Sequence, residues 1–196
     1  MVAPLTDTPG RTRVLDAAAE LFVAQGYPGT TLRQIAATAG IKAGSVYHHF
    51  DSKEALFVAV LNEGMVVMTD AFATTEDELG ANADDTDAQL VAHVRAHLGA
   101  VLENGPYTTA HVTSFSSAPE AVRSQVVPMR DHYEQMWQDL FAQLFPALDS
   151  QALRLHRLIL FGSMNSASEW FDPDGDVSLD RLSSTISEQF LHGVRP

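Results

Sequence analysis

A ten-residue stretch, IKAGSVYHHF (Ile41–Phe50), concentrates anion-binding side chains in a chain that is acidic overall. Gly44 has no side chain, so the backbone there can approach a phosphate group closely. Ser45 and Tyr47 offer hydroxyl groups and His48 offers an imidazole, all of which can contact phosphate oxygens or base edges. These residue types indicate recognition of a polyanion.

Two lysines and two apolar residues support this interpretation. Lys42 and Lys53 fall at expected helix N-termini, where backbone N–H groups already favour anions. Val46 and Phe50 are four residues apart and would point inward, holding the segment on its neighbours. The polar face would then be left outside.

No other group of residues indicates catalysis or a bound cofactor. Cysteine is absent, which excludes disulfides, thiolate metal sites and thiol nucleophiles. The sequence has no phosphate-cradling glycine motif, no nucleophile elbow and no carboxylate pair spaced for acid–base work. His93 and His97 have the i, i+4 spacing of a metal pair, with His111 or His132 as conceivable third ligands, but the adjacent glutamate of a metalloprotease motif is missing. We expect a non-enzyme without metal or cofactor.

The elements that position these residues are predicted to be helical. Helical periodicity extends along nearly the whole chain and sustained period-two alternation is absent, which predicts an all-α fold of about nine helices. The composition of TTEDELGANADDTD, residues 74–87, predicts a loop. Expected helices cover 9–25, 31–40, 43–49, 53–72, 87–103, 107–117, 120–145, 150–170 and 178–192.

The first three helices have the lengths and turns of a helix-turn-helix module. Thr31-Leu32-Arg33-Gln34 has the spacing of a capping box that opens the second helix, and Gly40 can end it. In such a module the later helix lies in the major groove of DNA. The decapeptide would then belong to the recognition helix.

Charge is distributed unevenly along the chain. The net charge is −13, from 12 basic and 25 acidic residues. Residues 1–60 contain 5 of each, so the remaining residues carry the whole net charge. A neutral head on an acidic body would let one surface meet DNA while the rest of the molecule is repelled by it.

Residues 12–61 resemble the N-terminal region of TetR-type transcriptional regulators. The matching residues are Ala18, Leu21, Phe22, Gly26, Thr31, Ile35, Ala36, Ala39, Gly40, Gly44, Tyr47, Phe50, Lys53 and Leu56. The resemblance implies a DNA-binding domain over 1–56, and an effector-binding and dimerisation domain over 57–196. It also implies a homodimer, a double-stranded operator with two-fold symmetry, and release of DNA by a small effector. The implied DNA contacts are Thr31, Arg33, Lys42, Gly44, Ser45, Tyr47, His48 and Lys53.

The sequence departs from the family pattern at the start of the third helix. The family commonly has a capping Ser or Thr at the position of Lys42 and a basic residue at that of Ala43. Loss of such a cap costs about 1 kcal/mol, so we expect packing to hold this helix. Each of three residues has an alternative to DNA contact. Thr31 would act only as a helix cap, Arg33 would be a solvated surface charge, and His49 would be structural.

Methionine and aromatic residues recur at helical spacing in the acidic body. Such stripes usually form the core, but together they also make adaptable lining for an apolar ligand. Tyr133, His97 and Asn165 would supply the polar contacts that orient it. The candidate effector-binding residues are Met65, Met68, Phe72, His97, Val101, Phe115, Met129, Tyr133, Met136, Trp137, Asn165 and Trp170.

A second, shorter resemblance concerns the ligand. LILFGSMNSASEWFDPDG, Leu158–Gly175, is similar to the C-terminal segment of TetR-type regulators of lipid, fatty-acid or sterol breakdown. It implies an acyl-CoA thioester or a related lipid metabolite. An acidic body suits the phosphates of CoA only if Arg123, Arg130 or Arg154 gather at the entrance.

The last two long helices are the candidate dimer interface. Two such helices from each subunit would form a four-helix contact under two-fold symmetry. The alternative is that these faces pack only within one protomer. The candidate interface residues are Leu155, Leu158, Ile159, Gly162, Ser166, Leu179, Leu182, Ile186 and Phe190.

These features predict a one-component repressor that a largely hydrophobic effector releases from DNA. The alternative is an all-α carrier or enzyme with a vestigial head, which would have no need to retain Gly44, Tyr47 and Lys53 together. The N-terminus lacks the apolar core of a signal peptide, and we found no apolar run of about 20 residues. We therefore expect a cytoplasmic protein with no membrane partner.

Overall fold

A computed structural model describes residues 9–80 and 85–194, and its regular structure is entirely helical. Within that part of the chain the prediction of an all-α fold with about nine helices is confirmed. The first eight residues of the predicted head, residues 81–84 of the predicted loop and the last two residues lie outside the description. The α-helices are α1 (Pro9–Gly29), α2 (Leu32–Thr38), α3 (Ala43–Val46), α4 (Lys53–Leu79), α5 (Thr86–Leu102), α6 (Pro106–Ser114), α7 (Glu120–Leu144), α8 (Ser150–Ser166) and α9 (Leu179–Val194), with short 3-10 helices η2 (Phe115–Ser117) and η3 (Ala167–Glu169).

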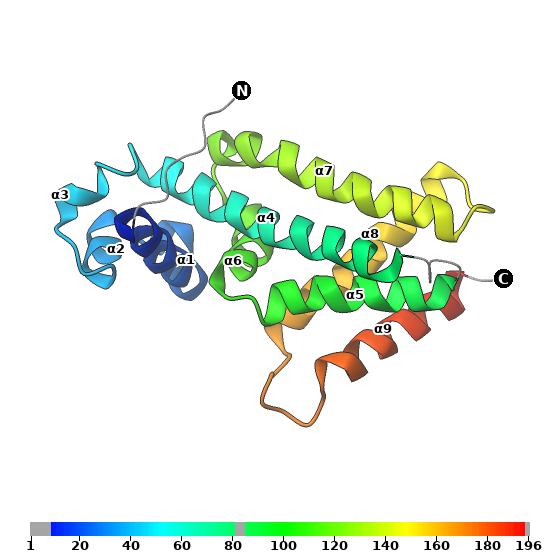
Figure 1. The fold of residues 1–196 in the computed structure, drawn as a ribbon. Helices are drawn as coiled ribbons and strands as arrows, with labels where there is room; N and C mark the ends of the chain where they lie inside the picture. Colours follow the sequence, from blue (N-terminus) through cyan, green and yellow to red (C-terminus); the bar gives the residue numbers. More distant parts are fainter. Residues whose placement is uncertain (1–8, 81–84, 195–196) are drawn as a thin grey trace.

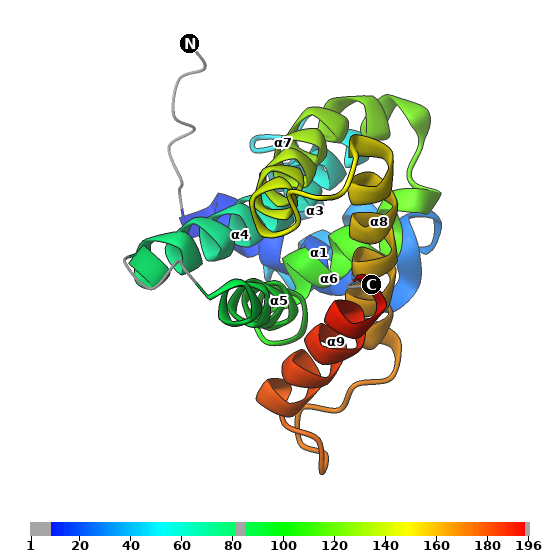
Figure 2. The ribbon, with the colours of Figure 1, turned by 90° about the vertical axis from the view of Figure 1, so that its right-hand side faces the viewer.

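The molecule has a small head and a larger body joined by one long helix. Helices α1, α2 and α3 form the head, and α4 runs from it along the length of the body (Figure 1). Seen from the side, α8 follows one edge of the body with α7 above and α9 below (Figure 2). The fold therefore places the residues predicted to contact phosphate at one end and the methionine-rich stripes at the other.

Specific residues mark the helix ends in the head. α1 is interrupted at Gly26, whose φ of 70° favours glycine, so the stop predicted there is confirmed. The predicted capping box at the start of α2 is also confirmed. The backbone N–H of Gln34 donates to the Thr31 hydroxyl over 3.3 Å, and the Thr31 N–H donates to Gln34 Oε1 over 2.8 Å. Gly40, with a φ of 68°, follows the end of α2.

Helix α3 is shorter than the sequence predicted. It covers Ala43–Val46, and residues 47–49 form a turn instead of a further helical turn. No side chain caps its N-terminus at Lys42, as expected. Val46 and Phe50 are both buried in the head core, so packing holds this segment in place.

The predicted loop over residues 74–87 is wrong in its first part. α4 continues to Leu79, because its acidic end packs against α5. Thr75 is buried, and the carboxylate of Glu76 lies 3.2 Å from Nε2 of His93 on α5. Small and acidic residues in this stretch therefore stay helical through tertiary contacts that composition does not reveal.

Helix α4 belongs to two apolar cores. Phe57, Val60 and Leu61 pack in the head core, whereas Met65 and Met68 pack in the body core. A boundary after residue 56 thus falls inside a helix that both units share. By length and composition alone α4 could cross a membrane, with a mean hydropathy of 1.5. Its central position against α1, α5, α6 and α7 accounts for that apolar composition.

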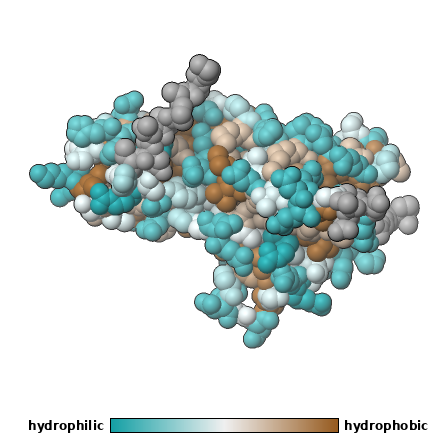
Figure 3. Space-filling view, viewed as in Figure 1, coloured by the Kyte–Doolittle hydropathy of each residue, from teal (hydrophilic) through white to brown (hydrophobic). Residues whose placement is uncertain are grey.

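Helix α6 makes a second connection between body and head. It crosses α4 at Gly64, where an added Cβ would lie 2.6 Å from the carbonyl oxygen of Tyr107. The hydroxyl of Tyr107 donates to Asp16 of α1 over 2.7 Å. The face of the molecule that contains these helices is mostly hydrophilic, with apolar atoms exposed near its middle (Figure 3).

Candidate functional site

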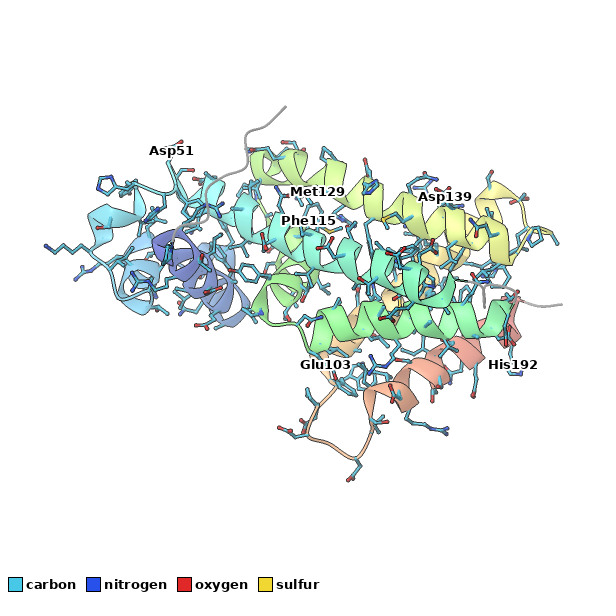
Figure 4. All side chains as sticks on the ribbon, viewed as in Figure 1. Asp51, Glu103, Phe115, Met129, Asp139 and His192 are labelled. Carbon is cyan, nitrogen blue, oxygen red and sulfur yellow. The ribbon has the colours of Figure 1, made fainter. Side chains whose placement is uncertain are left out.

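The predicted DNA contacts gather at the outer end of the head. α3 lies at the tip of the molecule (Figure 1), and Asp51 marks the turn that leads from it into α4 (Figure 4). Tyr47 is 59% exposed, an unusual position for a large aromatic side chain. The other exposed candidates are Thr31, Arg33, Lys42, Gly44 and His48, and Ser45 is half-buried.

Lys53 has a structural role that the sequence did not predict. Its ammonium donates to the carbonyl oxygens of Tyr27 and Thr30, each over 2.7 Å, and lies 4.1 Å from the centre of the Tyr27 ring. Tyr27 in turn donates to Glu54 over 2.6 Å, and burial raises the pKa of its hydroxyl to about 12. Lys53 therefore fastens α4 to the end of α1, and its predicted contact with phosphate stays a prediction.

The body contains a cavity of about 210 Å³ between α4, α5, α6, α7 and α8. Phe115, labelled in Figure 4, lines this cavity. Most of its wall is apolar or aromatic, with a few polar groups. The lining residues are Met65, Met68, His97, His111, Val112, Phe115, Ser116, Arg130, Tyr133, Glu134, Phe161 and Asn165.

Half of the predicted effector-binding residues line this cavity, and half do not. Met129 and Met136 line separate surface depressions, because only one flank of the α7 stripe faces the cavity. Trp170 is exposed beyond the end of α8. The cavity includes Met65, Met68, His97, Phe115, Tyr133 and Asn165. Val101 and Trp137 are fully packed in the core, and Phe72 belongs to the core but also lines the depression that Met136 lines.

Helical spacing could have located some of the residues that sequence reasoning missed. Phe161 precedes Asn165 by four residues on α8, and Arg130 and Glu134 flank Tyr133 on α7. Phe161 shares a helix face with Asn165, Arg130 shares one with Tyr133, and Glu134 follows Arg130 by four residues. The contribution of α6, through His111 and neighbouring residues, depends on how the helices pack.

A buried hydrogen-bonded chain crosses one wall of the cavity. His97 Nδ1 lies 2.9 Å from the Tyr133 hydroxyl, and His97 Nε2 lies 2.9 Å from Asn165 Oδ1. Burial lowers the pKa of His97 to about 4, although the bond to Asn165 opposes this shift. The neutral imidazole therefore donates from Nε2 to Asn165 and accepts from the Tyr133 hydroxyl at Nδ1. Burial also raises the pKa of Tyr133, so its hydroxyl stays protonated.

A second histidine lies where the cavity meets α4. His111 Nδ1 donates to the carbonyl oxygen of Leu61 over 3.2 Å, and its ring stacks on Phe115. The guanidinium of Arg130 covers the other part of this wall, 4.3 Å from the centre of the Phe115 ring. Burial, with a smaller effect of Arg130, lowers the pKa of His111 to about 4. Both cavity histidines are thus neutral at pH 7.

His93 and His97, the candidate metal pair, have separate hydrogen-bond and ion-pair partners. His93 Nδ1 lies 2.8 Å from the Gln89 carbonyl oxygen and its Nε2 faces Glu76, whereas His97 faces Tyr133 and Asn165. Across residues 9–80 and 85–194, no three histidine or carboxylate side chains come together in a way that could hold a metal ion.

The predicted dimer residues divide between an exposed and a buried set. On α8, Leu155, Leu158 and Ile159 are 48–57% exposed, and Gly162 and Ser166 are also exposed. On α9, Leu179, Leu182 and Phe190 are buried in the body core of the protomer, and Ile186 packs against it. This face of α9 faces inward because it covers α5, with which α9 makes its main contact.

A helix-turn-helix head joined by a long helix to an all-α body with a cavity is the arrangement of a DNA-binding transcriptional regulator. The family profile described as "Bacterial regulatory proteins, tetR family" matches residues 14–60, and "Tetracyclin repressor-like, C-terminal domain" matches residues 83–194. The chain belongs to the tetR family.

Individual relatives agree with this assignment over the full length. The chain is 30% identical over 203 residues to the HTH-type transcriptional repressor KstR2 of Rhodococcus jostii, covering 96% of this chain and 92% of the relative. The ketosteroid transcriptional regulator KstR2 of Mycobacterium tuberculosis has the same fold, with a TM-score of 0.76, 23% identity and 100% coverage of both chains. AibR, solved with isovaleryl coenzyme A and operator DNA, has a TM-score of 0.73 at 21% identity, covering 92% of this chain and 97% of AibR.

Proposed function

We propose that this regulator is a homodimeric repressor that binds a two-fold symmetric operator and is released by a small, largely apolar effector. The observation that carries the proposal is the cavity in the body, lined partly by Met65 and Met68 of α4. The same helix begins in the head, where Lys53 fastens it to α1. A ligand that prefers one position of α4 would therefore change the placement of the head.

Within the head, we assign DNA contact to the exposed residues around α3. Arg33 and Lys42 would contact phosphates, Gly44 would allow close approach of the backbone, and Tyr47 and His48 would contact phosphates or base edges. In a dimer the two α3 segments would enter successive major grooves, roughly 34–36 Å apart. Residues 1–56 would act as the DNA-binding unit and the remainder as the effector-binding and dimerisation unit.

The effector is proposed to be an acyl thioester with a short or branched acyl group. The cavity of about 210 Å³ is smaller than the roughly 300–1,000 Å³ typical of sites for drug-sized ligands. A short acyl chain fits without rearrangement, as the isovaleryl group bound by AibR suggests, whereas a steroid like those implied by the KstR2 relatives would need the cavity to widen. An adjoining surface depression lined by Arg154 and Arg157 would receive the CoA phosphates.

Dimerisation is proposed to use α8. Its outward face has a stripe of large apolar residues in the protomer, and such a stripe is costly to leave in water. Gly162 and Ser166 continue the stripe with small side chains, so a second helix could approach closely.

A gel-shift experiment tests the proposal. The purified protein is incubated with the DNA upstream of its own gene across a salt series, with a scrambled duplex of equal composition as control. We expect binding to the upstream DNA that weakens steeply with salt, and release on addition of isovaleryl-CoA or octanoyl-CoA. Equal binding to the scrambled duplex, or no release by any acyl-CoA up to an eight-carbon chain, would count against the proposal.

A further inference from the structure

One wall of the cavity is charged, although most of the remaining wall is apolar. Glu134 on α7 lies between two guanidinium groups. Its Oε1 is 3.3 Å from Nη2 of Arg130, four residues earlier on the same helix. Its Oε2 is 2.9 Å from Nη1 of Arg157 on α8. The single carboxylate of Glu134 thus forms ion pairs with two guanidinium groups.

Because Arg157 is buried, its ion pair with Glu134 matters for stability. Arg157 is only 5% exposed, and the Glu134 side chain is 27% exposed. A buried guanidinium needs a partner, because desolvation without one costs several kcal/mol. Besides Glu134, the Arg157 Nε donates to Gln138 Oε1 over 3.3 Å. Two guanidinium groups present ten N–H donors in total, far more than one carboxylate and one amide oxygen can satisfy.

The surrounding groups do not cancel the remaining positive charge. His97 and His111 also line the cavity, and burial keeps both neutral at pH 7. In the adjoining depression, Arg154 and Asp131 add one charge of each sign. This end of the cavity therefore holds one more cation than carboxylate, even though the whole chain carries a net charge of −13.

We infer that Glu134 is an internal stand-in for an oxyanion of the effector. A carboxylate or phosphate oxygen of the ligand takes its place beside Arg130, while the apolar part of the ligand fills the cavity. The inference rests on the proposed function, because it concerns the effector of the same cavity. Glu134 also lines the adjoining depression, so its carboxylate stays at this end of the cavity when the ligand takes its place beside Arg130. One anionic group then brings the charge there to zero, whereas a neutral lipid leaves the excess cation unmatched.

Displacement of Glu134 by the ligand would also affect α8, the proposed dimer helix. Arg157 is held to α7 by Glu134 and Gln138, and it lies on α8 between Leu155 and Ile159, which form the exposed stripe. When Glu134 is displaced, the tie between α7 and α8 changes. An anionic ligand would then affect the relation of the two protomers as well as the position of α4.

The experiment compares three probes that share an eight-carbon chain: octanoate, octanoyl-CoA and 1-octanol. Their affinities for the full-length protein are measured by titration calorimetry. We expect wild type to bind octanoate more tightly than octanol. Glu134→Gln should strengthen octanoate binding about tenfold and leave octanol binding unchanged, because the competing charge is removed while the shape is kept.

Two further variants make the result interpretable. Removal of the Glu134 charge leaves the buried Arg157 without its carboxylate, so Arg130→Gln tests the inference without that cost to folding. This variant should lower octanoate affinity to the level of octanol. Glu120→Gln is the matched control: Glu120 lies on the same helix, pairs with Arg123 and is absent from the cavity wall, so binding of all three probes should stay unchanged.

The outcomes separate this inference from the proposed function. A gain in Glu134→Gln with octanoate assigns the oxyanion to a carboxylate, and a gain with octanoyl-CoA alone assigns it to a phosphate of the thioester. An equal gain with octanol, or no gain with either anion, overturns the inference. Selective anion binding that fails to release DNA in the gel shift would overturn the effector role but leave the inference standing.

Discussion

At the scale of single residues, burial determines what the polar side chains of the cavity can do. His97 is enclosed between Tyr133 and Asn165, and its low pKa follows from the loss of water around the ring. His111 is neutral for the same reason, beside the cation of Arg130. The wall can therefore offer uncharged polar groups to a ligand, while its charge comes from Arg130 and Glu134, with Arg157 paired to Glu134 behind it.

The buried histidines predict that stability depends on pH. The pKa of His97 is lowered to about 4 in the folded chain, against about 6.5 when unfolded, so the unfolded state binds more protons as the pH falls below about 6.5. This removes about 2 kcal/mol of unfolding free energy between pH 7 and pH 5, and the loss is complete below about pH 4. In urea unfolding at the two pH values, His97→Gln should lose about 2 kcal/mol less than wild type.

The same substitution at the exposed His132 provides the control for replacing a histidine. An unchanged pH dependence in His97→Gln would mean that His97 is not held neutral in the folded protein. Any loss of stability that is equal at both pH values reflects only the broken hydrogen bonds to Tyr133 and Asn165.

At the scale of elements, two glycines differ in why a side chain is absent. Gly64 lies where two helices cross, and Gly44 lies in the segment proposed to contact DNA. At Gly64 an added Cβ would meet the backbone of α6 at 2.6 Å, whereas at Gly44 it would meet nothing within 4 Å. Gly64 thus permits the contact between α4 and α6. Gly44 has no such packing role, which is consistent with the proposal that its backbone approaches DNA closely.

These two glycines give a matched pair of predictions. Gly64→Ala should lower the unfolding free energy by about 1–3 kcal/mol, because the two helices must separate. Gly44→Ala should leave the unfolding free energy unchanged or raise it by up to about 1 kcal/mol, yet weaken operator binding. Chemical unfolding and a gel shift on both variants check the pair. Undiminished operator affinity in Gly44→Ala would remove this backbone from the DNA interface.

The uncapped start of α3 gives another prediction at this scale. Lys42→Ser supplies the missing capping oxygen and should stabilise the segment by about 1 kcal/mol. It also removes a cation from the proposed phosphate contacts, so the slope of log affinity against log salt should decrease by about one. Unchanged affinity and slope would show that Lys42 is not at the DNA surface.

At the scale of the whole molecule, the proposed function requires two protomers, and the exposed stripe on α8 is the surface proposed to join them. Leu158 and Ile159 are about half exposed in the protomer, so a charge there should not disturb the fold. α9 contributes its apolar face to the core of its own chain. The interface is therefore expected to depend on α8 more than the sequence suggested.

Leu158→Glu should convert the dimer into folded monomers and abolish tight binding to an operator with two half-sites. Sedimentation velocity measures the mass, and circular dichroism checks that the helices remain. Val127→Glu is a suitable control, because Val127 is an exposed apolar residue on α7, outside the stripe. If Leu158→Glu keeps the mass of the unmodified protein, the α8 stripe is not the dimer interface.

The sequence by itself determined the helical class, the main helix ends and the segment that can meet DNA. Those features depend on residues near each other in the chain: the capping box at Thr31, the positive φ at Gly26 and Gly40, and the spacing of Val46 and Phe50. Local chemistry of this kind does not depend on the remainder of the fold.

Only the tertiary structure decided which residues of each stripe face the cavity, which face of α9 is covered and what Lys53 contacts. A helical stripe is wider than the cavity it borders, so Met65 lines the cavity while Trp137 is fully packed and Met136 lies at a separate depression. The segment after Thr74 stays helical because α5 packs on it. Pairs such as Glu134 with Arg157 come from different helices, and their meeting depends on the packing of α7 against α8, which spacing along the chain cannot specify.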